Sequence, residues 1–213
     1  MPPILIWNKC IRVSSQGIGY PDYPVINSTI KCPFNCTFTT DRKFTATYRL
    51  DSSVFMPYDA LTRITPTTPK EYIWDQKEVL AIVKNKTKLA FQALSHCNSE
   101  SGRDLISKKL QKLMGLEVVG VCFGRRGCDD ACYNRKTHMF YLALENNICH
   151  NYVTEKFWNS LGSLTVPVVF SRSVFEGMDV PSDAFIALDD FKSVNEFVAH
   201  LKALQNDTER YLK

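Results

Sequence analysis

After about residue 75, short apolar runs alternate with segments of helical periodicity, and brief connections join them. Between residues 101 and 114, leucine and isoleucine recur at the spacing of one helix face. Alternating strands and helices pack best as a parallel sheet covered on both faces, so a Rossmann-like α/β domain is predicted. We expect strands at residues 88–94, 117–121, 139–144, 166–170 and 185–187, and helices at 75–83, 101–114, 154–162 and 194–205.

The ends of the predicted helix 154–162 carry residues that favour helix boundaries. A threonine oxygen can accept a hydrogen bond from a free N–H of the first turn, and Thr154 stands where this cap is needed. Gly162 lies near the other end, where glycine favours termination.

The residues before this region are less regular. Residues 3–7 are an apolar run typical of a buried strand, and residues 44–49 alternate like a strand. Between them, residues 8–41 have the glycine, proline and cysteine content of a loop. Prolines keep residues 62–69 out of a sheet, so this segment is predicted to be a linker. We therefore expect two domains, at residues 1–65 and 66–213.

The composition is that of a folded protein with a small positive charge. Of 213 residues, 45% are apolar and 23% are charged, which is ordinary for a globular chain. The net charge of +4 favours an acidic ligand such as a nucleotide diphosphate, but it is too diffuse to indicate a nucleic-acid partner. Lys108, Lys109 and Lys112 lie at helical spacing and are interpreted as a solvated helix face.

The cysteines favour disulfides and an oxidising compartment. Cys32 and Cys36 are four positions apart, as are Cys128 and Cys132, which raises the alternative of a zinc site. Neither pair has the two-residue gap of a zinc knuckle, and no histidine follows at zinc-finger spacing, so we expect no metal. An even number of cysteines fits disulfides better. The eight are Cys10, Cys32, Cys36, Cys97, Cys122, Cys128, Cys132 and Cys149.

Four glycosylation sequons also indicate the lumen of the secretory pathway. Their acceptor residues are Asn27, Asn35, Asn85 and Asn206. Residues 1–7 are apolar but too few for a signal-peptide core or a membrane span. We expect any membrane attachment to depend on an anchor that this chain does not contain.

Two predicted strand-to-helix junctions carry polar residues that suit a nucleotide sugar. Ligands of open α/β sheets bind at the carboxyl ends of the strands, and these junctions span residues 95–103 and 145–156. Arg103 and Lys156 would supply cations beside free N–H groups for a diphosphate, and Glu155 could bridge sugar hydroxyls. The alternative interpretation is that the cations are surface charges and that Glu155 is a first-turn carboxylate.

Several segments resemble the α-1,3-fucosyltransferases. Residues 140–158 (FYLALENNICHNYVTEKFW) are similar to that family's signature, in which an apolar strand leads to Glu-Asn, a cysteine and Tyr-Val-Thr-Glu-Lys. The family's order continues in residues 166–169 (VPVV) and 182–191 (SDAFIALDDF). Upstream, residues 47–58 (TYRLDSSVFMPY) and 88–103 resemble the family's Tyr-Arg-x-Asp-Ser segment and its strand, turn and arginine. The resemblance covers roughly residues 44–213.

The resemblance implies a GT-B-like fold and a donor site for GDP-fucose. Arg103 and Lys156 would neutralise the diphosphate, and Glu155 would hold hydroxyls of fucose or ribose. The family's reaction is an inverting transfer of L-fucose to a GlcNAc hydroxyl of a glycan, in the Golgi lumen. No Asp-x-Asp triplet occurs in the chain, so no obligatory metal or other cofactor is expected. The nucleotide and sugar pocket would be lined by Asn146, Tyr141, Tyr152, Tyr48 and Ser95.

The chain departs from the family in its N-terminal, acceptor-side part. An inverting transferase needs a general base, which the family carries in a Glu-Ser-Pro-like stretch. No Glu-Ser-Pro occurs here, and no glutamate precedes Glu71, so the catalytic base has no counterpart. His96 replaces a family asparagine. We expect a truncated or internally deleted member, with a catalytically inactive GDP-sugar-binding module as the alternative. A secreted cysteine-rich adhesion domain is a more distant alternative.

Overall fold

The computed structural model describes residues 46–52, 54–124 and 137–212. The chain divides into two compact units, Met1–Pro57 and Tyr58–Lys213, each considered by itself. The predicted domain boundary, between residues 65 and 66, lies inside the second unit. It falls in the exposed segment before the first helix, which contains the predicted linker 62–69 and has neither helix nor strand there.

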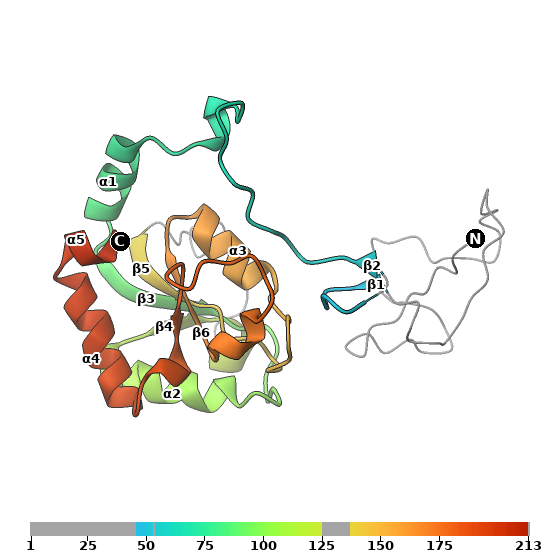
Figure 1. Cartoon of the computed structure of the whole chain (residues 1–213). Helices are drawn as coiled ribbons and strands as arrows, with labels where there is room; N and C mark the ends of the chain where they lie inside the picture. Colours follow the sequence, from blue (N-terminus) through green and yellow to red (C-terminus); the bar gives the residue numbers. More distant parts are fainter. Residues whose placement is uncertain (1–45, 53, 125–136, 213) are drawn as a thin grey trace, which may run out of the picture. The chain divides into compact units, whose positions relative to one another are not determined.

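The second unit is built on a five-stranded sheet in the order β4–β3–β5–β6–β7 (Figure 1). Every neighbouring pair runs parallel, as the alternation of strands and helices predicts. The central strand β5 pairs with β3 on one side and β6 on the other, and all five of its residues are buried. The strands are β3 (Lys88–Ala93), β4 (Glu117–Val119), β5 (His138–Leu142), β6 (Val166–Val169) and β7 (Ile186–Ala187).

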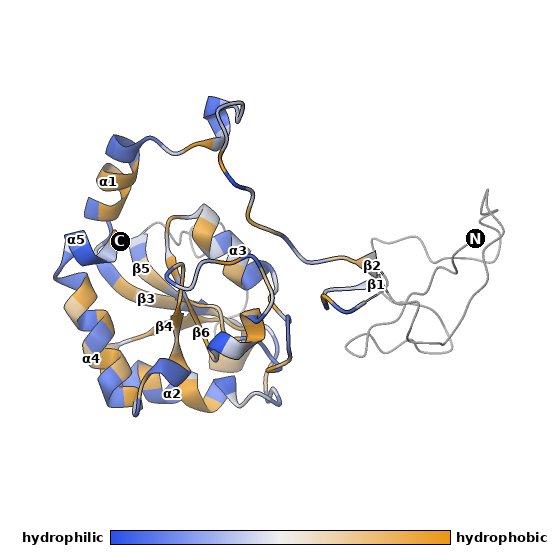
Figure 2. Cartoon of the chain, viewed as in Figure 1, coloured by the Kyte–Doolittle hydropathy of each residue, from blue (hydrophilic) through white to orange (hydrophobic). Residues whose placement is uncertain are grey.

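Helices cover both faces of the sheet. Successive side chains of β5 point to opposite faces, so each of its faces packs against different helices. Phe140 and Leu142 pack with residues of α2 and α4 in one core cluster. Tyr141 packs in the other cluster with residues of α3. Figure 2 shows the apolar strands between helices whose outer residues are hydrophilic. The helices are α1 (Gln76–Lys84), α2 (Arg103–Met114), α3 (Glu155–Gly162), α4 (Val194–Gln205) and α5 (Thr208–Tyr211).

The predicted elements of this unit are confirmed to within two residues at each end. Helix α2 begins at Arg103 rather than residue 101 because Gly102, with φ of 68°, has the left-handed backbone that precedes it. Lys108, Lys109 and Lys112 are exposed on α2, which confirms the solvated face. Short elements without a detectable period were not predicted. They are α5 and the 3-10 turns Lys70–Tyr72, Val121–Phe123, Arg172–Phe175 and Leu188–Asp190.

The described part of the first unit contains one short pair of strands. β1 (Ala46–Thr47) pairs in parallel with β2 (Val54–Phe55). β1 lies within the predicted strand 44–49 but is shorter among the described residues, and β2 was not predicted. The predicted strand 3–7 and loop 8–41 lie outside the described residues.

A buried lysine closes the amino edge of the sheet. The ammonium of Lys86, which is only 7% exposed, donates to the carbonyl of His138 at 2.9 Å and to Thr165 Oγ1 at 3.1 Å. Burial lowers the pKa of Lys86 to about 8, whereas an unfolded lysine titrates near its ordinary value of about 10.4.

We predict that the α/β unit becomes more stable as the pH rises from about 8 toward 10. In this interval the unfolded chain binds more protons at Lys86 than the folded chain, so the free energy of unfolding increases, by roughly 1–2 kcal/mol. Above that interval burial of Tyr211, which raises its pKa, has the opposite effect. Urea unfolding at several pH values checks this, and Lys86→Met should flatten the slope. If the free energy of unfolding of that variant still rises with pH as steeply as in the unaltered chain, another group causes the effect.

Candidate functional site

Two loops meet at the carboxyl edge of the sheet, where the predicted ligand junctions lie. The backbone N–H of Ser101 donates to the carbonyl of Asn146 at 3.1 Å, and Ser101 Oγ donates to the carbonyl of Glu145 at 2.7 Å. The loop after β3 is therefore bonded to the loop after β5. The parallel strands bring together junctions that are more than forty residues apart in the chain.

Glu145, three residues after the end of β5, organises the start of α3. Its Oε1 accepts from the backbone N–H of Thr154 at 2.9 Å and from the Thr154 hydroxyl at 2.6 Å. Its Oε2 accepts from Lys156 Nζ at 3.0 Å. Glu145 is only 8% exposed, and protein donors form hydrogen bonds with both of its carboxylate oxygens.

The boundaries of α3 agree with the prediction, but its capping differs from the expected pattern. Thr154 occupies the N-cap position, but its side chain makes no capping hydrogen bond; its hydroxyl donates to Glu145 and its oxygen accepts from Lys156. Gly162 is the last residue of α3 and has no left-handed backbone. The positive φ that follows the helix, 50°, belongs to Leu164.

Lys156 lies in the first turn of α3 between two carboxylates. Besides Glu145, its ammonium contacts Thr154 Oγ1 at 2.8 Å and Glu155 Oε1 at 3.2 Å. Burial raises the pKa of Glu155, but the charge and hydrogen bond of Lys156, aided by Thr154, outweigh it, so that pKa lies below its ordinary value. Glu155 is therefore an ionised acceptor beside a cation, at a helix terminus that attracts anions.

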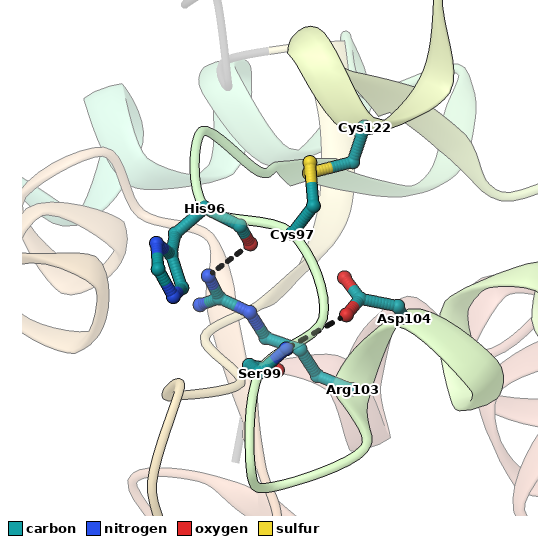
Figure 3. The surroundings of a disulfide bond; sticks show 6 residues. All are labelled: His96, Cys97, Ser99, Arg103, Asp104 and Cys122. Carbon is teal, nitrogen blue, oxygen red and sulfur yellow. Dashed lines mark hydrogen bonds between the residues drawn. A yellow bond between two sulfur atoms is a disulfide. The ribbon is translucent and has the colours of Figure 1, made fainter.

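Arg103 is buried instead of lying at the surface. Its guanidinium donates to the carbonyl of His96 at 3.0 Å (Figure 3). It also donates to the carbonyl of Leu144 at 3.0 Å, and the residue is 2% exposed. Burial lowers the pKa of Arg103, while the negative charge of Glu145 acts in the opposite direction. Arg103 thus joins the two loops in this structure, and the alternative of a solvated surface charge is wrong for it. Its contact with a diphosphate stays a prediction.

A disulfide between Cys97 and Cys122 braces the loop that precedes α2, whose first residue is Arg103. In Figure 3 it lies beside His96 and the first turn of α2, where the N–H of Ser99 donates to Asp104 at 3.1 Å. Disulfide formation is confirmed for this pair. Cys149 differs from the expected pairing, because it is a free, exposed thiol among the described cysteines. The other five, including both pairs considered for zinc, lie outside the described residues.

The remaining predicted site residues differ in their placement. Asn146 and Tyr152 lie together, because the tyrosine hydroxyl donates to Asn146 Oδ1 at 3.2 Å. Ser95 is exposed directly after β3, at the same edge. Tyr141 is 1% exposed and its ring lies 5.9 Å from that of Phe91, so it is a core residue and not an exposed wall of a pocket. Tyr48 belongs to the first unit, and its role in the donor site stays a prediction.

A small pocket lies beside the start of α3, lined by Glu145, Tyr152, Phe157 and Phe175 among others. Its volume of about 20 Å³ is roughly enough for one water molecule. A sugar nucleotide is far too large to be enclosed in this pocket in this conformation.

The described segments contain no group of three or more His, Cys, Asp or Glu side chains placed to hold a metal ion. Within the same segments, no helix has the length and apolar character needed to cross a membrane. Asn85 and Asn206 are exposed at the carboxyl ends of α1 and α4, whereas Asn27 and Asn35 lie outside the described residues.

Sequence reasoning did not assign roles to Glu145 and Asn151. Asn151 adopts φ of 59°, and its amide donates to the carbonyl of Glu176 at 3.0 Å, which fixes the loop before α3. Asparagine tolerates this backbone better than most residues. A carboxylate directly after an apolar strand was a detectable signal for Glu145, because such a position is buried and requires partners.

Comparisons with known proteins identify the family. The sequence model of "Glycosyltransferase family 10 (fucosyltransferase) C-term" matches residues 83–213. Alpha-(1,3)-fucosyltransferase fut-5 of Caenorhabditis elegans is 32% identical over 208 residues, covering 90% of this chain and 53% of that protein. The 4-galactosyl-N-acetylglucosaminide 3-alpha-L-fucosyltransferase 9 of Bos taurus is 33% identical over 171 residues, covering 79% of this chain and 44% of that protein. The chain thus spans about half the length of these relatives.

Solved structures agree on the fold. A crystal structure of an alpha1,3-fucosyltransferase with GDP has a TM-score of 0.51 at 24% identity, covering 62% of this chain and 38% of that one. A second, with GDP-fucose, has a TM-score of 0.51 at 21% identity, covering 70% and 48%. The expected α/β, GT-B-like fold is therefore confirmed. Taken with the family match over residues 83–213, these similarities show that the chain belongs to glycosyltransferase family 10, the fucosyltransferases.

Proposed function

We propose that this chain binds GDP-fucose at the carboxyl edge of its parallel sheet. The observation that carries the proposal is the Lys156 ammonium in the first turn of α3, beside the helix N-terminus. A diphosphate favours a cation beside the positive end of a helix dipole, and Lys156 occupies that position. Two alpha1,3-fucosyltransferases of similar fold were crystallised with GDP and with GDP-fucose.

The proposed roles of the site residues follow from their positions. Lys156 contacts the diphosphate, and Arg103 adds a fixed positive charge beneath the two loops. Glu155 accepts hydrogen bonds from hydroxyls of fucose or ribose, and its lowered pKa keeps it ionised for this purpose. Asn146, Tyr152 and the exposed Ser95 line the nucleotide sugar. No obligatory metal is part of the proposal, because these cations can balance the phosphate charge.

The proposed reaction is an inverting transfer of L-fucose to a GlcNAc hydroxyl of a glycan, giving an α-1,3 linkage. The acceptor oxygen forms a bond to C1 of fucose while the bond from C1 to the diphosphate oxygen breaks. A base removes the acceptor proton, and GDP leaves with the electron pair. Lys156 stabilises the charge that develops on the leaving diphosphate, as fixed cations do in phosphate chemistry.

A second candidate is a GDP-sugar-binding module that does not catalyse transfer. One observation favours it: no glutamate precedes Glu71, so the N-terminal region offers no Glu-Ser-Pro base. The two candidates share the donor site and differ only in turnover.

Two measurements separate these candidates. Calorimetry with GDP-fucose tests the donor site, and transfer of radiolabelled fucose to a GlcNAc-containing glycan tests turnover. Binding with transfer supports the enzyme, and binding without transfer supports the module. No binding would reject both.

The same proposal places the protein in the lumen of the secretory pathway, as expected for a Golgi fucosyltransferase. The Cys97–Cys122 disulfide supports an oxidising compartment, and Asn85 and Asn206 are accessible to glycan addition. Loss of the attached glycans on treatment with an endoglycosidase, seen as a mass shift, would support this location. An unglycosylated protein isolated from its native cells would contradict it.

A further inference from the structure

Glu145 is the buried carboxylate to which both predicted diphosphate cations are electrostatically connected. Lys156 Nζ lies 3.0 Å from its Oε2 in an ion pair. Its negative charge also acts on the buried guanidinium of Arg103 and supports that group's protonated form. Lys156 and Arg103, the two residues proposed to neutralise the diphosphate, therefore share one anionic neighbour, Glu145, which is not among the residues proposed to contact the ligand.

The hydrogen bonds of Glu145 also fix the backbone from which Lys156 projects. Oε1 holds both the N–H and the hydroxyl of Thr154, two residues before Lys156. The Thr154 hydroxyl oxygen is itself 2.8 Å from Lys156 Nζ. The carboxylate thus determines the position of the first turn of α3 and the direction of the lysine side chain together.

We propose that Glu145 is a positioning residue for diphosphate binding, acting through Lys156. The inference rests on the proposed function of this site. Glu145 does not contact the ligand. It holds the ammonium and the first turn of α3 in the arrangement that a diphosphate needs, so that binding does not have to order a long, flexible side chain.

Coulomb's law alone predicts the opposite effect for this residue. A carboxylate near the phosphates repels them, so removal of its charge would tighten binding of GDP if position did not matter. A positioning role predicts weaker binding when the carboxylate is removed. The direction of the change therefore distinguishes the two explanations.

Glu145→Gln tests this role, because glutamine has nearly the same shape as glutamate. Its amide, however, cannot replace both carboxylate oxygens as acceptors. Thr154 presents two donors and Lys156 presents only donors, whereas glutamine has one acceptor atom and one donor group. If the amide oxygen faces Thr154, its NH₂ group faces the ammonium, and Lys156 is released. We expect GDP to bind the Glu145→Gln chain about tenfold more weakly, the equivalent of one lost hydrogen bond between charged groups.

Calorimetric titration of the full chain with GDP measures this effect. Glu117→Gln is the matched control, because it removes the same charge at the amino edge of the sheet, where Glu117 pairs with Lys88 at 2.8 Å. It should leave GDP affinity unchanged. A double-mutant cycle with Lys156→Ala tests the route: Glu145→Gln should add little loss once Lys156 is absent. Glu145→Asp keeps the negative charge but shortens the side chain by one methylene group. This variant should also bind GDP more weakly than the unaltered chain does.

The outcomes separate the possibilities. Tighter or unchanged GDP binding in Glu145→Gln would overturn the positioning role, as would fully additive losses in the cycle. Absence of GDP binding by the unaltered chain would instead overturn the proposed function, and the positioning role with it. If Glu145→Gln does not fold, Thr154→Val tests the same array, since it removes the hydroxyl shared by Glu145 and Lys156. Unchanged GDP affinity in that variant would reject the positioning role.

Discussion

Replacing Lys156 with alanine is expected to weaken GDP-fucose binding by about 100-fold, or about 2.8 kcal/mol. The variant loses the ammonium at the start of α3, and only the helix N-terminus and the buried Arg103 then oppose the phosphate charge. The loss exceeds that of an ordinary surface lysine because a hydrogen bond between charged groups is stronger than one between neutral groups. Calorimetry with GDP-fucose measures the change.

Lys109→Ala is the matched control for this variant. It removes the same charge from an exposed position on α2 and should leave the affinity unaltered. Lys156→Ala also leaves Glu145 without its cationic partner, so circular dichroism has to show that the variant is folded. Equal affinities for the folded Lys156→Ala chain and the unaltered chain would contradict the diphosphate role.

Gly120→Ala is expected to destabilise the α/β unit by roughly 4 kcal/mol. Gly120 follows β4 with φ of 119° and ψ of 171°, a backbone conformation open essentially to glycine alone. A Cβ atom there would lie 1.9 Å from the carbonyl oxygen of Leu94. The N–H of Leu94 is bonded to the carbonyl of Val119 at 2.8 Å, so neither backbone can retreat without breaking the sheet. Urea unfolding followed by circular dichroism tests this.

Gly115→Ala separates steric overlap from backbone strain. Gly115 also has a positive φ, 67°, but a Cβ atom added there meets nothing within 4 Å. Its substitution should cost only about 1–2 kcal/mol. Similar losses at the two glycines would mean that the close approach to Leu94 is not the cause.

The regular elements of the α/β unit could be predicted because their periodicity is a local property of the chain. An apolar run such as residues 139–144 is apolar because β5 is buried on both faces, and the alternation with helices then requires parallel pairing. Two-residue strands such as β2 contain only one period, so no alternation can repeat in them. Their pairing depends on partners that no local pattern identifies.

The site was predicted less completely than the fold. Lys156, Glu155, Asn146 and Tyr152 do gather at the carboxyl edge. The sequence did not reveal which side chains turn inward, so it did not predict that Arg103 and Tyr141 are both buried. For Arg103 the reason is physical: carbonyls at the ends of β3 and β5 supply acceptors for its guanidinium, and only the folded sheet brings them together.

By itself, the sequence determined the α/β class, the order of the elements and the edge of the sheet at which the polar junctions gather, because these follow from periodicity and chain direction. Only the tertiary structure decided how the charges at that edge are paired. Glu145 precedes Thr154 and Lys156 by nine and eleven positions, and the turn between β5 and α3 brings its carboxylate to 2.6 Å and 3.0 Å from them. A buried carboxylate needs donors on both oxygens, and the fold supplies them across a distance in sequence that no helix or strand period spans.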